Sequence, residues 1–264
     1  FRKEVLGEDK FDFIFFYNSR NIRRKSTSDL MLAFHNFVED LPEAEKKRVA
    51  LLMHTELSHE AGTDLPAVIR DVIPNVSDQI IFTNKKLEQH QLNYLYNMVD
   101  VTVNVSSNEG FGLSIAESLM TETPVILNVT GGLQDQAGFM DENGDYLDPD
   151  THFTYDWGSN HDGRYTDCGE WVVPIFPASR SLVGSPVTPY IFDDRCKFED
   201  ITDAMRTWYD TTPEERERKG ALGREFCMGP GGLNSENMCN LFIDHMNIAM
   251  DKFTPRQKFI MEKV

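Results

Sequence analysis

The first half of the chain alternates short apolar runs with segments whose apolar residues recur at helical spacing. We expect strands at the mostly apolar runs Phe11–Tyr17, Val49–Met53, Gln79–Phe82 and Pro124–Asn128, and at Val101–Val105, where apolar and polar residues alternate. The expected helices lie between them, at Ser28–Val38, Leu65–Val72, Leu92–Met98 and from about Gly112 onward. Strands that alternate with helices favour a parallel sheet with helices on both faces. The sequence therefore predicts an α/β, Rossmann-like fold, in which ligands bind at the carboxyl ends of the strands.

The second half is less regular at first. Residues 138–170 are rich in Asp, Gly, Asn and aromatic residues and show no periodicity, which predicts a long irregular excursion. Regular structure is expected to resume with a strand at Trp171–Ile175 and helices at about 198–210, 213–227 and 235–250. Thr212 followed by Pro213 and two glutamates is a typical helix start.

Charge and cysteine content exclude several classes of function. The chain carries 43 acidic and 26 basic residues, a formal charge of −17, which argues against general affinity for nucleic acid or anionic membranes. No apolar run approaches the roughly 20 residues of a membrane-spanning helix. The four cysteines lack metal-ligand spacing, so we expect buried thiols in a reducing compartment, and hence a cytoplasmic protein.

The segment from Glu109 to Glu117 carries the strongest functional signal. It follows an expected strand, contains Gly110 and Gly112, and continues into an expected helix. A helix N-terminus with free backbone N–H groups attracts anions, and glycines let the backbone approach a ligand closely. The two carboxylates are at most about 12 Å apart along a helix axis. This spacing could place one carboxylate at each end of a nucleotide diphosphate-sugar, with the phosphates between them.

The same segment resembles the donor-binding signature of family-four retaining glycosyltransferases. That signature is Glu-Gly-Phe-Gly, a second Glu, Pro-Val and then Gly-Gly, which here are Glu109–Gly112, Glu117, Pro124–Val125 and Gly131–Gly132. Thr123 replaces the Gly that usually precedes Pro124, and we expect this change to alter a helix cap and no contact.

A basic loop follows the first expected strand. The family places an Arg and a Lys there, matched here by Arg20 and Lys25, with Arg23 and Arg24 between them. A departing nucleoside diphosphate develops negative charge, which fixed cations stabilise without a metal. The resemblance therefore implies that Arg20 and Lys25 hold the donor diphosphate.

The resemblance also implies an architecture. Family enzymes have the GT-B fold, with two Rossmann-like domains that face each other across a cleft and the donor motifs in the C-terminal one. Residues 1–250 would be that donor-binding domain. Residues 251–264, including Phe253, Phe259 and Ile260, would pack toward an N-terminal acceptor domain or subunit that is absent from this chain.

By this resemblance the chain belongs to an enzyme that transfers a hexose from a nucleotide-sugar to an acceptor with retention of configuration. The nucleotide-sugar would be a substrate, with no cofactor and no metal. Glu109 would act as a catalytic group with Arg20 and Lys25 and would orient the sugar hydroxyls, while Glu117 would bind the ribose. The remaining donor contacts would come from Gly110, Phe111, Gly112, Leu113, His54 and Thr83.

Two alternatives stay open at this point. The chain could be a nucleotide-sugar-binding subunit or module that has no catalytic activity by itself. It could also be a metal-dependent transferase, because Asp148-Pro149-Asp150 resembles the Asp-x-Asp motif of such enzymes.

Overall fold

A computed structural model describes residues 1–7, 10–184, 186–230 and 232–255. Within these residues, six parallel strands form the main sheet, in the order β3-β2-β1-β4-β5-β6. The strands are β1 (Phe13–Asn18), β2 (Val49–His54), β3 (Ile80–Thr83), β4 (Val101–Asn104), β5 (Val125–Asn128) and β6 (Val172–Ile175). The order reverses between β1 and β4, where Phe15 pairs with Leu51 on one side and with Val101 on the other. Such a reversal opens a crevice at the carboxyl ends of the strands.

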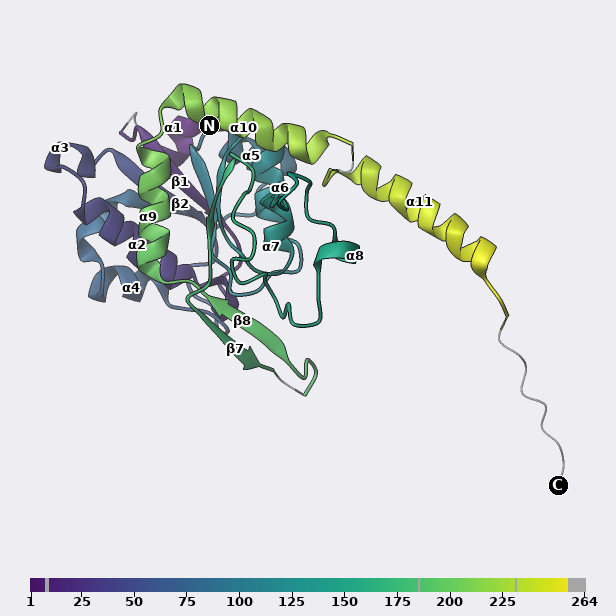
Figure 1. The fold of residues 1–264 in the computed structure, drawn as a ribbon. Helices are drawn as coiled ribbons and strands as arrows, with labels where there is room; N and C mark the ends of the chain where they lie inside the picture. Colours follow the sequence, from purple (N-terminus) through teal and green to yellow (C-terminus); the bar gives the residue numbers. More distant parts are fainter. Residues whose placement is uncertain (8–9, 185, 231, 256–264) are drawn as a thin grey trace.

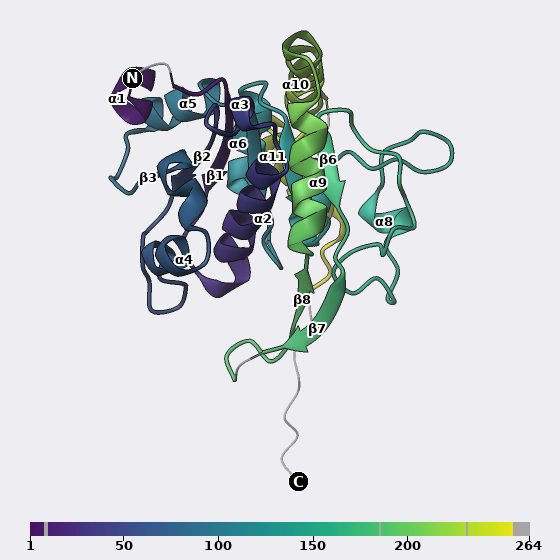
Figure 2. The ribbon, with the colours of Figure 1, turned by 90° about the vertical axis from the view of Figure 1, so that its left-hand side faces the viewer.

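Helices cover both faces of this sheet (Figure 1). The first face packs against α2 (Thr27–Glu39), α4 (Leu65–Asp71) and α9 (Phe198–Tyr209). Figure 2 looks onto this face, where α2 and α9 lie side by side. The second face packs against α1 (Arg2–Leu6), α5 (Gln89–Asn97), α6 (Leu113–Met120), α7 (Gly131–Gln136) and α10 (Pro213–Met228). The predicted α/β, Rossmann-like fold is confirmed.

The local sequence explains these elements. The central strands are almost entirely apolar and buried, as expected for parallel strands covered on both faces. Helix α4 begins where the Asp64 side chain accepts a hydrogen bond from the Ala67 amide, and α10 begins where Thr212 does the same for Glu215. The remaining short helices are α3 (Glu43–Lys46), α8 (Pro149–His152) and the 3-10 turns η1 (Arg23–Lys25) and η2 (Pro74–Gln79).

The sequence analysis was wrong about the junction between α6 and β5. The left-handed residue that ends α6 is Glu122, with a φ of 63°, so Thr123 does not occupy the glycine-like cap position. Thr123 is buried, and its hydroxyl donates a hydrogen bond of 3.0 Å to the Tyr96 carbonyl at the end of α5. The residue that replaces the family's glycine therefore makes a contact that ties α6 to α5.

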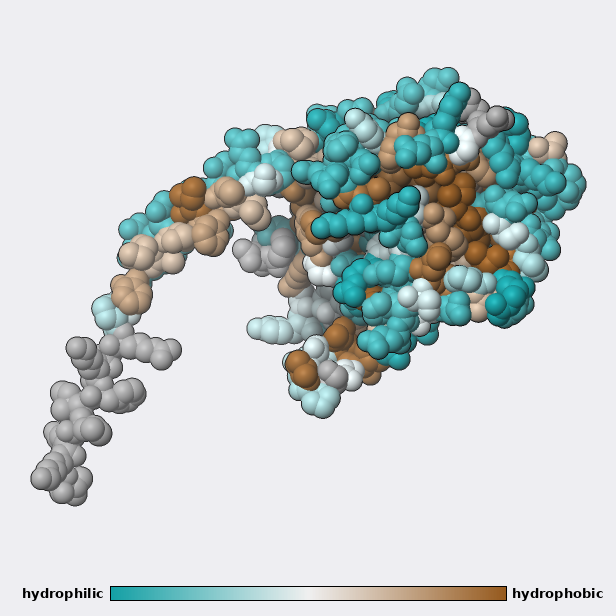
Figure 3. Space-filling model, turned by 180° about the vertical axis from the view of Figure 1, so that it is seen from behind, coloured by the Kyte–Doolittle hydropathy of each residue, from teal (hydrophilic) through white to brown (hydrophobic). Residues whose placement is uncertain are grey.

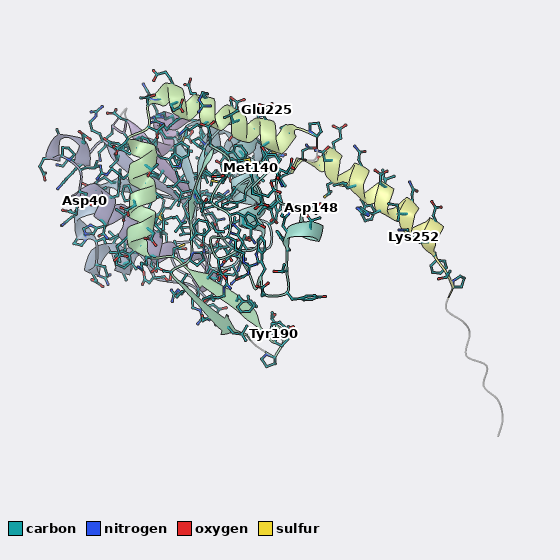
Figure 4. All side chains as sticks on the ribbon, viewed as in Figure 1. Asp40, Met140, Asp148, Tyr190, Glu225 and Lys252 are labelled. Atoms are coloured by element: carbon teal, nitrogen blue, oxygen red, sulfur yellow. The ribbon has the colours of Figure 1, made fainter. Side chains whose placement is uncertain are left out.

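The sequence analysis did not predict a hairpin made of β7 (Ser179–Val183) and β8 (Ile191–Arg195), which are antiparallel. The hairpin projects from the body beside the carboxyl ends of the central strands (Figure 1). Tyr190, 69% exposed, lies toward its far end (Figure 4). The excursion at 138–170 is irregular as predicted, apart from α8 and an isolated bridge between Met140 and Tyr146.

Helix α11 (Ser235–Lys252) confirms the predicted last helix but stands clear of the body (Figure 1). Its residues are all described and none of them is buried. Apolar side chains are exposed along it (Figure 3). Phe253 is 68% exposed, whereas Phe259 and Ile260 lie outside the described residues. The predicted division at residues 250 and 251 stays a prediction.

Two further expectations concern cysteines and membranes. The four cysteines, which all lie in described ranges, are free, but only Cys227 is fully buried and Cys239 on α11 is exposed. The expectation of buried thiols is therefore wrong for Cys239, because α11 lacks a covering layer. In the described part of the chain, every helix is too short or too polar to cross a membrane.

Candidate functional site

The carboxyl ends of β1 to β4 and the N-terminus of α6 surround a cavity of about 760 Å³, which we call the donor cavity. Nine of the ten residues predicted to bind the donor line it: Arg20, Lys25, His54, Thr83, Glu109, Phe111, Gly112, Leu113 and Glu117. Gly110 is not in the lining, although it lies between two residues that are. Four separate loops thus meet where the sequence predicted them to meet.

The N-terminus of α6 opens into this cavity through a glycine. Gly112 precedes the helix with a φ of 91°, a left-handed conformation that side chains disfavour. A Cβ atom at this position would also lie only 2.4 Å from the Leu133 side chain. Among the described residues, no side chain caps the helix, so its first amides can receive an anion.

The Gly131–Gly132 pair of the motif holds the loop that carries Glu109. The Gly132 amide donates a 3.0 Å hydrogen bond to the Glu109 carbonyl. Cβ atoms at Gly131 and Gly132 would come within 2.2 Å of the Glu109 carbonyl oxygen and 2.3 Å of the Gly110 carbonyl oxygen, respectively. The two glycines are therefore required for close packing of α7 against this loop, and they contribute indirectly to the site.

Glu109 forms ion pairs with two cations of the basic loop. Its Oε2 contacts Lys25 Nζ and lies 3.1 Å from Arg24 Nη1. The side chains of Glu109 and Lys25 are mostly buried, at 12% and 11% exposure. Burial by itself would raise the pKa of Glu109, but the hydrogen bond and charge of Lys25, followed by Arg24, hold that pKa below its ordinary value. Glu109 is therefore an ionised carboxylate between two cations.

Two arginines of this loop, Arg20 and Arg24, line the cavity, and Arg20 is the more exposed of the two. Arg20 lies at the edge of the cavity, largely exposed, with its Nε 3.8 Å from Glu56. Arg24, which the sequence analysis did not select, lines the cavity, contacts Glu109 and donates a 2.8 Å hydrogen bond to the Asn108 carbonyl. Its position inside the same basic run was the available signal. The 3-10 turn η1 turns Arg24 and Lys25 inward together.

Glu117, in α6, lines the cavity and belongs to a second group of hydrogen-bonded side chains. The Tyr96 hydroxyl donates a 2.7 Å hydrogen bond to Glu117 Oε2 and accepts one of 2.9 Å from the Asn18 side-chain Nδ2. Tyr96 is 1% exposed, and burial, with the nearby charge of Glu117, raises its pKa well above the ordinary value. This tyrosine therefore stays a hydrogen-bond donor and fixes the Glu117 carboxylate on the α6 face that lines the cavity.

His54 and Thr83 meet at the ends of β2 and β3. His54 Nδ1 and Thr83 Oγ1 are 2.8 Å apart, and both residues line the donor cavity. Burial lowers the pKa of His54, which favours the neutral imidazole. The two residues form a polar rim at the side of the cavity formed by β2 and β3.

The Asp148-Pro149-Asp150 segment begins the short helix α8, away from the central sheet (Figure 4). Asp148 is not part of the lining of the donor cavity, and its backbone amide donates a 2.9 Å hydrogen bond to His152. The side chain of Asp150 lies outside the described part of the structure. Within the described residues, no three His, Cys, Asp or Glu side chains form a group that could hold a metal.

Comparison with known proteins supports the resemblance. The family model described as "Glycosyl transferases group 1" matches residues 73–149, which contain the whole Glu109–Gly132 motif. This stretch, which carries the motif, is therefore similar to glycosyl transferases group 1. No curated protein sequence matches the chain.

Solved structures share the fold. The chain covers 90% of the C-terminal domain of a glycosyl transferase group 1 family protein from Francisella tularensis, with 85% of this chain aligned, 15% identity and a TM-score of 0.53. A sucrose-phosphate synthase from Thermosynechococcus elongatus matches 92% of this chain at 19% identity and a TM-score of 0.58. The Anabaena protein HepE, solved in complex with UDP and glucose, matches 93% at 12% identity and a TM-score of 0.59.

The extent of these matches is informative. The chain spans 46% of the sucrose-phosphate synthase and 51% of HepE, about half of each, but nearly all of the isolated C-terminal domain. The fold is therefore that of the C-terminal domain of GT-B glycosyltransferases, as the sequence predicted. At these identities the likeness establishes the fold alone.

Proposed function

We propose that this chain is the donor-binding part of a retaining glycosyltransferase that transfers a hexose from a nucleotide-sugar without a metal or another cofactor. The observation that carries the proposal is the cluster of Lys25, Arg24 and Glu109 beside the open N-terminus of α6. Cations, free amides and a carboxylate in one cavity match the three chemical parts of such a donor: diphosphate, leaving oxygen and sugar hydroxyls.

Each part of the donor has a suitable group in the cavity. Lys25 and Arg24, with the amides of Leu113 and its neighbours, would bind the diphosphate and stabilise its charge as the glycosidic bond breaks. Arg20 at the edge would join them when the donor replaces Glu56 as its partner. Glu109 would accept hydrogen bonds from the sugar hydroxyls.

The nucleoside would lie toward β2 and β3. Glu117, fixed by Tyr96, would accept hydrogen bonds from the ribose hydroxyls, which is a preferred interaction for a carboxylate. His54 and Thr83 would border the nucleobase. HepE, which shares the fold, is solved with UDP-glucose, so uridine donors are the first to test.

The acceptor would be held by a second Rossmann-like domain or subunit. The chain spans about half of HepE and of the sucrose-phosphate synthase, and α11 exposes apolar side chains that another surface could cover. The alternative is that the chain is a subunit that binds the donor and has no activity of its own. The same cavity geometry fits this alternative equally well. The cytoplasmic location inferred from the cysteines is likewise a proposal.

Calorimetry in the presence of EDTA tests the proposal. UDP, GDP and ADP and their hexose conjugates would be titrated into the folded chain. Binding of one nucleoside diphosphate without metal supports the proposal, whereas silence for all of them, or binding only after Mg²⁺ or Mn²⁺ is added, contradicts it.

A further inference from the structure

Strand β8 carries two consecutive acidic residues, Asp193 and Asp194, which both form hydrogen bonds with the loop before Glu109, Asp193 through its carboxylate and Asp194 through its backbone amide. The outer hairpin partner, β7, has no buried residue among Ser179–Val183, which are all described. Asp194, by contrast, is completely buried. Burying a charge at the base of an exposed hairpin is costly unless the charge is paired, so the partners of Asp194 indicate its role.

The partners of Asp194 come from three different segments. Its carboxylate accepts hydrogen bonds from the Thr130 hydroxyl at 2.7 Å, from the Ser159 hydroxyl, and from Arg180 Nε at 3.0 Å. Its backbone carbonyl accepts a 2.8 Å bond from the Asn128 side chain. Asp194 thus joins the end of β5, the irregular excursion and the hairpin at one point.

Asp193 and the backbone of Asp194 hold the loop that follows β4 and precedes Glu109. The Asp194 amide donates a 2.7 Å hydrogen bond to the Ser107 carbonyl. The Asp193 carboxylate accepts hydrogen bonds from the Ser107 hydroxyl and from the Asn108 side chain, the latter at 3.3 Å. Residues 107 and 108 are therefore bound to β8, and the residue that follows them is Glu109.

The same two residues are held from the other side by the basic loop. The Ser107 amide donates a 2.7 Å hydrogen bond to the Arg24 carbonyl, and Arg24 Nη1 donates to the Asn108 carbonyl at 2.8 Å. The loop before Glu109 is therefore clamped between β8 and η1. If β8 releases the Ser107 and Asn108 side chains, the loop keeps its bonds to the basic loop, a 3.5 Å bond from the Thr130 hydroxyl to the Ser107 carbonyl and the bond from the Gly132 amide to the Glu109 carbonyl. These remaining bonds hold the loop backbone, whereas the Asn108 side chain, next to Glu109, loses its anchor on Asp193.

We propose that Asp193 and Asp194 are positioning residues that hold the Glu109 carboxylate where the donor sugar needs it. Neither residue is among those that line the donor cavity, and both act through Ser107 and Asn108. The inference rests on the proposed function. By this inference the β7–β8 hairpin contributes to sugar recognition through the inner strand, β8.

The test compares Asp193→Ala, Asp193→Asn and Asp194→Asn with the unmodified chain. Each would be titrated in EDTA with the nucleoside diphosphate that binds best and with its hexose conjugate. We expect Asp193→Ala to lower the affinity for the hexose conjugate about tenfold, as for a lost charge-assisted hydrogen bond. The affinity for the bare diphosphate should stay within about twofold of that of the unmodified chain. Asp193→Asn should recover part of the loss because its amide oxygen still accepts from Ser107.

Controls separate this role from simple destabilisation. Asp156→Asn removes an exposed ion pair with Arg164 in the excursion and should change neither affinity. If Asp194→Asn does not fold, the two Asp193 variants still test the positioning role. Asp193 is only partly buried, so we expect these variants to fold. Equal losses for both ligands, or no loss in a folded Asp193→Ala, would overturn the positioning role alone. Absence of binding by the unmodified chain would instead overturn the proposed function and this inference with it.

Discussion

Lys25 and Glu109 form an ion pair in the donor cavity although they are 84 positions apart in the sequence. The pair joins the loop after β1 to the loop after β4, the two strands between which the sheet order reverses. In a chain with a net charge of −17, it keeps a cation and a carboxylate desolvated and in place before a ligand arrives. A bound donor would exchange this contact for two others, Lys25 to the diphosphate and Glu109 to the sugar.

Glu109→Gln should therefore separate the two halves of the donor. Loss of a charge-assisted hydrogen bond to the sugar is expected to weaken binding of a hexose conjugate by about 1.5–3 kcal/mol, which lowers the affinity roughly ten- to a hundredfold. The bare diphosphate should bind as well as before or better, because Lys25 and Arg24 lose a competing partner. Calorimetry with both ligands measures the difference. Glu170→Gln, which removes an exposed pair with Arg218, is the control, and equal losses for both ligands in Glu109→Gln would refute the assignment.

Glu117→Gln and Tyr96→Phe should act on the nucleoside instead. Glu117→Gln is expected to lower the affinities for the bare diphosphate and for the hexose conjugate by the same factor, about tenfold, because both ligands contain the ribose. Tyr96→Phe should lower both affinities by less, since it removes only the hydrogen bond that orients Glu117. Isothermal titration of the two ligands against each variant gives the ratios. A loss confined to the hexose conjugate would contradict the predicted role of Glu117.

The sequence was sufficient for the sheet, the helices and the donor loops because these depend on local periodicity and on a contiguous motif. It was insufficient where partners come from distant segments. Arg24 could not be separated from Arg23 by sequence, since the choice depends on η1 and on Asn108. The β7–β8 hairpin was missed because both strands contain charged residues, Arg180 in β7 and Asp193 and Asp194 in β8. Neither strand therefore has the apolar run that identified most of the central strands.

His161 should make the stability of the fold depend on pH. It is completely buried, and its ring lies 4.4 Å from Phe139 and 5.3 Å from Trp157 between ring centroids. Neither ring nitrogen has a hydrogen-bond partner among the described residues. Burial lowers its pKa from 6.5 to about 4, although the charge of Asp162 opposes the shift and that of Arg164 adds to it.

The sign follows from the depressed pKa. Stability from the neutral ring is fully present above about pH 6.5 and is lost as the pH falls toward 4, by roughly 3 kcal/mol in total. Urea unfolding at pH 7.5 and pH 4.5 should show this loss in the unmodified chain and a smaller one in His161→Phe. His245→Gln, on exposed α11, is the matched control. The same pH dependence in His161→Phe and the unmodified chain would show that His161 is not responsible.

Gly220→Ala should destabilise the chain although Ala is the better helix former by about 1 kcal/mol. Gly220 is buried within α10, and a Cβ atom there would lie 1.8 Å from the Glu122 carbonyl oxygen at the end of α6. Backbone must move to relieve this overlap, at a typical cost of about 1–3 kcal/mol. Thermal unfolding should therefore show a lower midpoint, whereas Glu217→Ala on the exposed side of α10 should change it little. A higher midpoint for Gly220→Ala would mean that α10 does not pack so closely.

The chain by itself should transfer no sugar efficiently, and an N-terminal half should restore transfer. Retaining transfer needs the acceptor hydroxyl held beside the anomeric carbon, and holding it there supplies several kcal/mol of the barrier. The donor cavity accounts for the predicted donor residues, whereas the exposed apolar stripe of α11, which includes Met238, Leu241 and Phe242, has no covering surface in the described structure. Leu241→Glu combined with Phe242→Glu should leave donor binding and unfolding of the isolated chain unchanged, because neither side chain is buried, but should reduce transfer by the assembled protein. Asn240→Glu on the same helix is the control for added charge. A radiolabelled-donor assay decides the matter: robust transfer to an acceptor by residues 1–264 alone would show that this chain is a complete enzyme and not the donor-binding half of one.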